Sequence, residues 1–223
     1  MLVESTDGPA VIDGRNLRSR RTRQALIDAL ISLIEEGDLR PTAPRIAQRA
    51  GVSLRSIYHH FDDLELLFAE TAQRQIERNA PLRQPLPTGG RLPVRVDALV
   101  RQKIRIWEAV TPIRTAASLQ EPFSPQLRAV RAELHRRNRD ELATVFAIEL
   151  DARSPEDALQ LLDALDAAVN WMAWRVMRTD VGLSVEGAEA VLRRTLMSLL
   201  TDGRALELLA AAEALVPEPS RSQ

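Results

Sequence analysis

Residues 42–61, TAPRIAQRAGVSLRSIYHHF, constrain this chain most, because they read as two short helices joined by a tight turn. Thr42 can cap the first helix by accepting a backbone N–H bond, and Pro44 falls in the first turn, where its missing N–H costs nothing. Gly51 is placed to end that helix, where a residue with positive φ is often needed. Ser53 can cap the second helix, so the spacing predicts a helix-turn-helix.

The apolar residues of this stretch share one side, since Ile46, Ala47 and Ala50 lie on one helical face and Ile57 and Phe61 continue it. The outward side of the second helix carries Leu54, Arg55, Ser56, Tyr58 and His59. An arginine with small polar neighbours and an aromatic hydroxyl suits a helix laid in the major groove of DNA. An ordinary αα-hairpin with a solvated face fits the same spacing, so the pattern alone leaves both interpretations open.

Charge is distributed unevenly along the chain. The 223 residues carry a net charge of −1, which by itself argues against a nucleic-acid-binding protein. Residues 15–60, however, contain nine arginines and four acidic residues, a net charge of +5, and the rest of the chain sums to −6. A basic N-terminal module on an acidic body is the charge asymmetry expected of a chain that meets a polyanion at one end.

Composition and motifs exclude several classes of protein. There is no cysteine, so disulfides and thiolate metal sites are excluded. No apolar run approaches the length of a membrane span and the first residues lack the build of a signal peptide, so we expect a cytoplasmic protein. The chain has no HExxH motif, no glycine-rich phosphate loop and no nucleophile elbow, and the adjacent His59 and His60 point to different helix faces. We therefore predict that it is not an enzyme and has no catalytic site, metal site or cofactor.

The N-terminal third divides into short segments. Residues 1–14 lack periodicity and are predicted to be a disordered arm. The basic run at 15–23 is predicted either to touch phosphates or the minor groove, or to be the solvated start of a helix. A strongly amphipathic helix is predicted at 22–36, and another helix is predicted from residue 62 to about residue 79.

The proline- and glycine-rich stretch 81–93 is predicted to be a linker or exposed loop. It separates a DNA-binding domain at 15–80 from a second domain at 81–223. The second domain is helical by pattern, without a convincing strand, so the predicted fold is all-α. Its predicted helices cover 94–110, 113–119, 124–150, 154–178, 184–201 and 205–216, with a break at Gly203.

Residues 22–71 resemble the DNA-binding region of TetR-family transcriptional regulators. The likeness rests on the first helix, Gly37, Thr42, the Ile46-Ala47 pair, Ala50-Gly51-Val52-Ser53 and Ile57-Tyr58-His59-His60-Phe61, which agree in order and register. It implies an N-terminal three-helix DNA-binding domain and a larger helical domain for ligand binding and dimerisation. It also implies a homodimer that binds a palindromic double-stranded DNA operator and acts as a ligand-responsive repressor.

Carried over by position, the resemblance assigns roles to the motif. Thr42 would bind phosphate, residues 53–56 would face bases, and Tyr58 and His59 would clamp the DNA backbone. Within 53–56, an arginine at residue 55 would bind guanine bidentately, worth about 1–3 kcal/mol. Leu54 would touch a thymine methyl group.

One position departs from the family pattern. The family usually has a lysine that donates to phosphate shortly after the aromatic pair, and this chain has Leu64 there, flanked by acidic residues. Arg45, Arg49 and the run at 18–23 are candidates to replace that contact.

The resemblance implies that the helices at 155–178 and 184–201 form a four-helix bundle across a two-fold axis, although they could instead pack only within the chain. It also implies an unidentified small-molecule effector bound inside the second domain. Residues that would line such a site, or simply fill a core, are Trp107, Phe123, Phe146, Trp171, Trp174 and Met177. An alternative function is a helical ligand-binding or adaptor protein of the same fold that has lost DNA binding.

Overall fold

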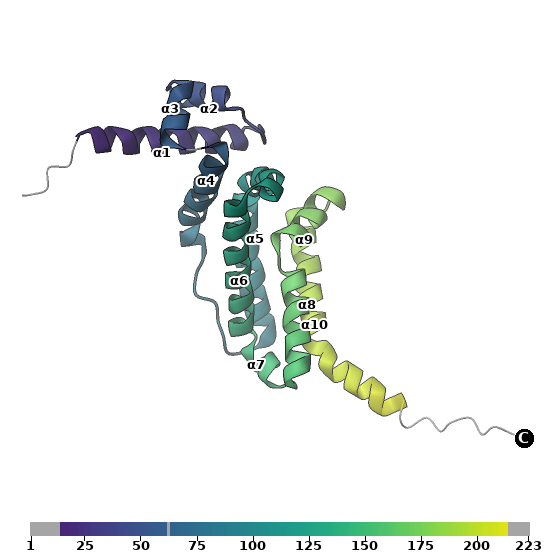
Figure 1. Cartoon of the computed structure of the whole chain (residues 1–223). Helices are drawn as coiled ribbons and strands as arrows, with labels where there is room; N and C mark the ends of the chain where they lie inside the picture. Colours follow the sequence, from purple (N-terminus) through teal and green to yellow (C-terminus); the bar gives the residue numbers. More distant parts are fainter. Residues whose placement is uncertain (1–13, 62, 214–223) are drawn as a thin grey trace, which may run out of the picture. The chain divides into compact units, whose positions relative to one another are not determined.

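The computed structural model describes residues 14–61 and 63–213, with side chains for 16–61 and 63–201. Every regular element in these ranges is a helix and none is a strand, so the predicted all-α fold is confirmed (Figure 1). The chain divides into unit 1, Met1–Arg78 with Pro112–Val130, and unit 2, Asn79–Thr111 with Arg131–Gln223. None of the helices described is both long and apolar enough to cross a membrane.

Unit 1 begins with four helices, α1 (Gly14–Glu35), α2 (Ala43–Ala50), α3 (Leu54–His60) and α4 (Leu64–Arg78). α1 packs against each of the other three, and α2 packs against α3. The predicted helix-turn-helix at 42–61 is confirmed as α2 and α3.

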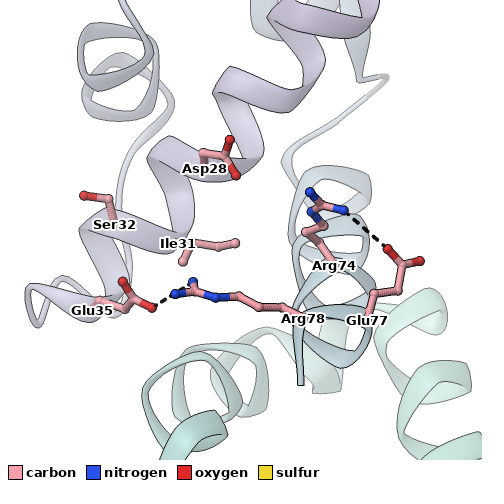
Figure 2. Close-up of a pocket in the computed structure, with 7 residues that line it drawn as sticks. All are labelled: Asp28, Ile31, Ser32, Glu35, Arg74, Glu77 and Arg78. Atoms are coloured by element: carbon pink, nitrogen blue, oxygen red, sulfur yellow. Dashed lines mark hydrogen bonds and ion pairs between the residues drawn. The ribbon is translucent and has the colours of Figure 1, made fainter. Parts of the chain in front are cut away.

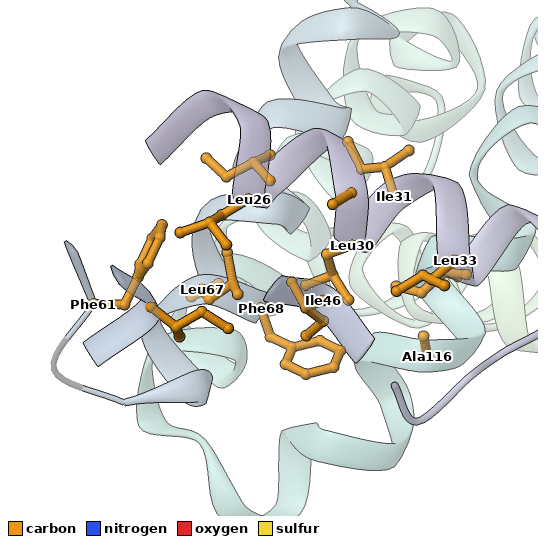
Figure 3. Close-up of a cluster of buried hydrophobic side chains, with 14 of the residues drawn as sticks. Leu26, Leu30, Ile31, Leu33, Ile46, Phe61, Leu67, Phe68 and Ala116 are labelled. Carbon is orange, nitrogen blue, oxygen red and sulfur yellow. The ribbon is translucent and has the colours of Figure 1, made fainter. Parts of the chain in front are cut away.

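The apolar stripe of α1 forms the centre of unit 1. Leu26 and Leu30 of this stripe are completely buried. Figure 3 shows Ile46 of α2, Phe61 at the end of α3 and Leu67 of α4 gathered around it. Burying each such side chain stabilises the fold by about 1.5–3 kcal/mol, so this cluster holds the short helices of the motif in place.

α1 is longer than the sequence pattern indicated. It begins at Gly14, whereas the apolar periodicity predicted a start at residue 22. Residues 16–21 are all exposed, so no apolar periodicity marks this part of the helix. The predicted arm at 1–14 lies outside the described residues except for Gly14.

Helix α5 (Leu92–Gln120) runs through Pro112 without a break. The prediction of a helix closing at residues 111 and 112 and a separate helix at 113–119 is therefore wrong. A proline inside a helix removes one hydrogen bond and costs about 3 kcal/mol. The continuation compensates for this cost because Ile113, Ala116 and Ala117 are buried in the core of unit 1.

The residues after α5 also belong to unit 1 as far as Val130. A short 3₁₀ helix, η2 (Glu121–Phe123), precedes α6 (Pro125–Val145). Ser124 caps α6, since its Oγ accepts the backbone N–H of Leu127 at 3.1 Å. Sequence reasoning did not associate this segment with the DNA-binding region, because nothing local in residues 112–130 shows which core they join.

Unit 2 contains the first part of α5, the rest of α6 and several further helices. These are the 3₁₀ turn η1 (Ala80–Leu82), α7 (Ala147–Asp151), α8 (Pro155–Ala168), α9 (Trp171–Arg175), the π-helix η3 (Val176–Asp180) and α10 (Val185–Glu213). Its core is centred on Leu99, Leu142, Phe146, Leu165 and Trp174, each at most 1 % exposed.

Three predicted helix boundaries in unit 2 are wrong. The predicted helix at 124–150 is divided at Phe146 into α6 and α7, and the one at 154–178 is divided after Ala168. The predicted break at Gly203 does not occur, since α10 runs from Val185 to Glu213. A glycine inside a helix costs only about 1 kcal/mol, which a long helix tolerates.

The interruption between α8 and α9 has a polar cause. The carbonyl oxygen of Val169 accepts from Asn138 Nδ2 at 2.9 Å. Asn170 Oδ1 then accepts the backbone N–H of Ala173 at 3.0 Å and caps α9. Asn138 also accepts from Lys103 Nζ at 2.6 Å, and Lys103 is ion-paired with Glu141. Burial lowers the pKa of Lys103, the single lysine of the chain, and the glutamate partly offsets that effect.

Two helix caps of unit 1 give a test of these local contacts. Ser124→Ala should lower the free energy of unfolding by about 1 kcal/mol, because it leaves the buried N–H of Leu127 without its acceptor. Thr42→Ala should cost less, since the Thr42 side chain makes no cap hydrogen bond to α2. Urea unfolding followed by circular dichroism measures both values, and equal losses would contradict the contrast.

Candidate DNA-binding surface

The turn between α2 and α3 has the geometry that its glycine permits. Gly51 has φ 68° and ψ 30°, in the left-handed region, as the sequence predicted for a helix-ending residue. Its N–H donates to the carbonyl of Gln48 at 3.2 Å, and the N–H of Val52 donates to that of Ala47 at 3.0 Å. These two bonds satisfy the last carbonyls of α2 and set the direction in which α3 leaves.

The two residues predicted to cap these helices through their hydroxyl groups do not do so. Thr42 and Ser53 occupy the N-cap positions with extended backbone, but neither side chain bonds to its helix. Ser53 Oγ lies 2.9 Å from Ser56 Oγ instead. The prediction of side-chain caps was therefore wrong. Thr42 is exposed, and its hydroxyl makes no hydrogen bond to a backbone N–H of α2.

α3 presents one exposed face and one buried face. Ile57 is fully buried, while Leu54 is 43 % and Tyr58 56 % exposed. Arg55 and His59 are also exposed and lie one turn apart on the same helix. The structure therefore brings together, on the outer face of α3, the residues that the sequence predicted to meet DNA.

Other predicted positions lie beside this face. Ser56 is half-buried, and Arg45 of α2 is exposed, with its guanidinium 2.8 Å from Asp38 Oδ2. Leu64, which stands where the family usually has a lysine, is half-buried and packs against the core of unit 1. Leu64 therefore contributes to packing at this position.

Arg23 is a residue that sequence reasoning underestimated. Its guanidinium forms a bidentate pair with Glu70 of α4, donates to the carbonyl oxygen of His60 and lies 4.4 Å from the ring centroid of Phe61. It thus ties α1 to α4 and to the end of α3. Its acceptors lie 37 and 47 residues away in the sequence, so no local pattern indicates this role.

Arg49 of α2 is engaged in the same way. Its guanidinium donates to both carboxylate oxygens of Glu36, at 2.7 and 2.6 Å, and to Ser32 Oγ at 2.6 Å. The hydrogen bond from Arg49 lowers the pKa of Glu36. These contacts fix α2 against the end of α1. They also engage the guanidinium of Arg49, which the sequence offered as a candidate phosphate ligand.

His60 ends α3 at the edge of the exposed face. Burial lowers its pKa, and the neighbouring His59 and Arg23 lower it further. Its ring Nδ1 lies 3.5 Å from Ser19 Oγ of α1. This contact brings the early turns of α1 beside the last turn of α3.

A groove of about 530 Å³ lies between α1 and α4. Figure 2 shows its lining residues, Asp28, Ile31, Ser32, Glu35, Arg74, Glu77 and Arg78. Arg78 pairs with Glu35 at 3.5 Å, and Arg74 pairs with Glu77 at 3.7 Å. Two of its three acidic residues are paired in this way and Asp28 has no arginine partner in the lining, so the groove carries a net charge of −1.

The aromatic residues predicted for an effector site fall into two places. Trp107, Phe146, Trp171 and Trp174 are buried in the core of unit 2, and Met177 packs against that core. Phe123 belongs to unit 1 and is 79 % exposed, so it is not part of that core.

The buried tryptophans have specific partners. The rings of Trp107 and Trp174 lie 5.7 Å apart. Trp174 Nε1 donates to Glu108 at 2.9 Å, and Trp171 Nε1 donates to Thr111 at 3.1 Å. Arg175 and Arg178 lie within about 6 Å of the rings of Trp171 and Trp174. The cluster therefore combines apolar surface with polar groups beside a π-helix, an element often found at functional sites.

Known proteins share both the motif and the fold. The model of the family described as "Bacterial regulatory proteins, tetR family" matches residues 26–71. A tetR-family transcriptional regulator from Streptomyces coelicolor is similar in structure, with a TM-score of 0.65, 19 % identity and coverage of 91 % of this chain and 92 % of that one. A transcriptional regulator from Rhodococcus sp. RHA1 has a TM-score of 0.57 and 20 % sequence identity, and the match covers 82 % of this chain and 95 % of that one. A TetR transcriptional regulator from the same organism has a TM-score of 0.51 and 23 % sequence identity, and the match covers 82 % of this chain and 97 % of that one. No curated protein matches significantly.

The short helix pair with its glycine turn and exposed second helix defines a helix-turn-helix DNA-binding domain. That domain is of the TetR family, which confirms the resemblance seen at residues 22–71. The solved structures, at 19–23 % identity, show a shared fold.

Proposed function

We propose that this protein is a transcriptional regulator that binds a palindromic DNA operator as a homodimer and represses transcription until a small molecule releases it. The observation that carries the proposal is the exposed face of α3, held on a rigid core by Ile57 and Phe61. Such a helix fits the major groove of B-DNA, and two copies related by a two-fold axis fit a palindrome. Bacterial chromosomes lie in the cytoplasm, so we propose that the protein acts there.

Within this proposal each residue of the surface has a role. Arg55 binds a guanine through both of its terminal nitrogens, and Leu54 contacts a thymine methyl group. Tyr58 and His59 bind the phosphate backbone on one side of the groove. Thr42 and Arg45, at the start of α2, bind phosphate on the other, and Ser53 and Ser56 donate to base edges.

Arg55 is the residue that tests base reading. Arg55→Ala should weaken binding to the operator by about 1–3 kcal/mol and remove the preference for guanine at one position of each half-site. Arg55→Lys is the matched control, because it keeps the positive charge but loses the planar fork. It should retain most non-specific affinity and still lose the base preference. Competition binding at fixed salt, with operators that carry each of the four bases at each position of the half-site, measures the affinity and the base preference. An unchanged preference for guanine in Arg55→Ala would refute this role.

The dimer is supported by apolar side chains left exposed on the last helices of unit 2. Leu159 of α8 is 56 % exposed, Met172 of α9 45 %, Val176 of η3 44 % and Val191 of α10 43 %. Solvent exposure of four large apolar residues on consecutive helices is what a covered interface leaves in a single chain. We propose that these residues meet their symmetry mates in a four-helix bundle.

A charge placed in that surface should separate the subunits. The double variant Val176→Asp and Val191→Asp should sediment as a monomer, because the dimer would have to bury four unpaired carboxylates, two from each subunit. Ile148→Asp is the matched control, since Ile148 of α7 is 53 % exposed and lies outside the proposed surface. It should leave the dimer intact. Analytical ultracentrifugation distinguishes the two results, and a monomeric parent protein would refute the dimer.

The effector is proposed to bind beside the aromatic cluster of unit 2, where Trp107, Trp171, Trp174 and Met177 combine apolar surface with Glu108. Phe146 completes this core, and Phe123 is not included because it belongs to unit 1. All three tryptophans of the chain lie in unit 2, so their fluorescence reports ligand binding. A small molecule that releases the operator should also change tryptophan emission, and Trp174→Phe should reduce that change. Release without any change in emission would argue against this site.

The alternative, an adaptor of the same fold that no longer binds DNA, predicts no sequence preference at all. It is less well supported, because the arginine and tyrosine of α3 are exposed, where they are available to bind DNA. Selection of bound sequences from a random DNA library by the purified protein separates the two functions.

A further inference from the structure

The first turns of α1 extend beyond the part of that helix that is buried. Residues 16–21 are all exposed, and the first fully buried residue of α1 is Leu26. Three of the exposed residues are arginines, Arg18, Arg20 and Arg21. This segment contributes no apolar burial to unit 1, so its length and charge need another explanation.

The placement of these arginines is unfavourable for an isolated helix. Their positive charges lie at the N-terminal end of α1, where the helix dipole is also positive, and the first turn contains no acidic residue. Arg18 and Arg21 are three residues apart, so two like charges are neighbours on the helix surface. An anionic partner would offset both the unfavourable interaction with the helix dipole and the repulsion between the arginines.

The contacts of unit 1 distinguish these arginines from the others nearby. Arg23 is paired with Glu70, Arg45 with Asp38 and Arg49 with Glu36. Among the described residues, no acidic side chain pairs with Arg18, Arg20 or Arg21. They are therefore three neighbouring basic side chains of unit 1 that remain available to a polyanion outside the reading face of α3.

The same turns lie next to α3. Ser19 Oγ is 3.5 Å from the ring of His60 in the last turn of α3, and Arg23 donates to the carbonyl oxygen of His60. Arg18 and Arg20 are the immediate neighbours of Ser19, so they flank the side of α1 that contacts α3. A helix seated in the major groove has a phosphate strand along each edge, and the first turns of α1 lie beside the last turn of α3.

We propose that the first turns of α1, through Arg18, Arg20 and Arg21, bind phosphates of the DNA immediately outside the base pairs read by α3. This surface extends the contact of each subunit beyond the helix-turn-helix and supplies affinity without sequence preference. The inference rests on the proposed function, because it requires that α3 seats in an operator.

The test compares salt dependence. DNA is first selected from a random library by the parent protein, and binding to that DNA is then measured between about 50 and 200 mM salt. The triple variant Arg18→Ala, Arg20→Ala and Arg21→Ala should bind at least tenfold more weakly at low salt. Its slope of log K against log salt should be shallower by about 2–3, because each lost phosphate contact removes about 0.9. Its base preferences should be unchanged.

The control variant carries Arg101→Ala, Arg105→Ala and Arg194→Ala, which remove the same charge from exposed positions of unit 2. Its slope should match that of the parent protein. The charge-conserving variant Arg18→Lys, Arg20→Lys and Arg21→Lys should also keep the parent slope, since lysine binds phosphate as a point charge. Thermal unfolding without DNA should occur at the same or a higher temperature in the alanine variant, because the charge repulsion is removed.

A second measurement locates the contact. Trimming the DNA flanks outside the selected sequence should weaken binding of the parent protein and leave the alanine variant unaffected. If the alanine variant keeps the parent slope and the same sensitivity to trimming, the inference is wrong while the proposed function stands. If the parent protein selects no sequence, the proposed function itself fails, and this surface fails with it.

Discussion

The DNA-binding unit depends on burial of the apolar stripe of α1. The second helix of the motif, α3, has only seven residues, and a helix of that length is not stable alone in water. Its shape is imposed by Ile57 and Phe61, which are 0 % and 1 % exposed against α1 and its neighbours. The outer face of α3 can therefore carry exposed arginine, tyrosine and histidine side chains, because the inner face provides its stability.

Charged groups then fix the orientation of these helices relative to one another, which apolar burial alone does not define. Arg23 joins α1 to Glu70 and to the last carbonyl of α3, and Arg49 joins α2 to Glu36. Exposed ion pairs contribute at most about 1 kcal/mol each, so these contacts matter more for geometry than for stability. Unit 2 uses the same device inside its core, where Asn138 receives Lys103 and holds the carbonyl of Val169 at the point where α8 ends.

The sequence predicted the elements that have local causes. The glycine turn at Gly51, the apolar stripe of α1 and the exposed residues of α3 follow from spacing and from the φ angle that one residue needs. Contacts between distant residues were not predictable in this way. Arg23 and Arg49 read as free basic charge, Pro112 reads as a helix end, and the break after Ala168 depends on an asparagine in another helix. The effector cluster was predicted in part, since spacing alone did not show that Phe123 belongs to a different unit from the tryptophans.

The continuation of α5 through Pro112 makes the DNA-binding unit discontinuous in sequence. Its core includes Ile113, Ala116 and Leu127, which lie more than thirty residues beyond the end of α4. A fragment that stops at Arg78 therefore lacks part of its own interior and exposes apolar surface that the full chain covers. The chain also passes between the two units at three points, after Arg78, Thr111 and Val130. Neither unit can therefore be separated from the other by a single cut of the chain.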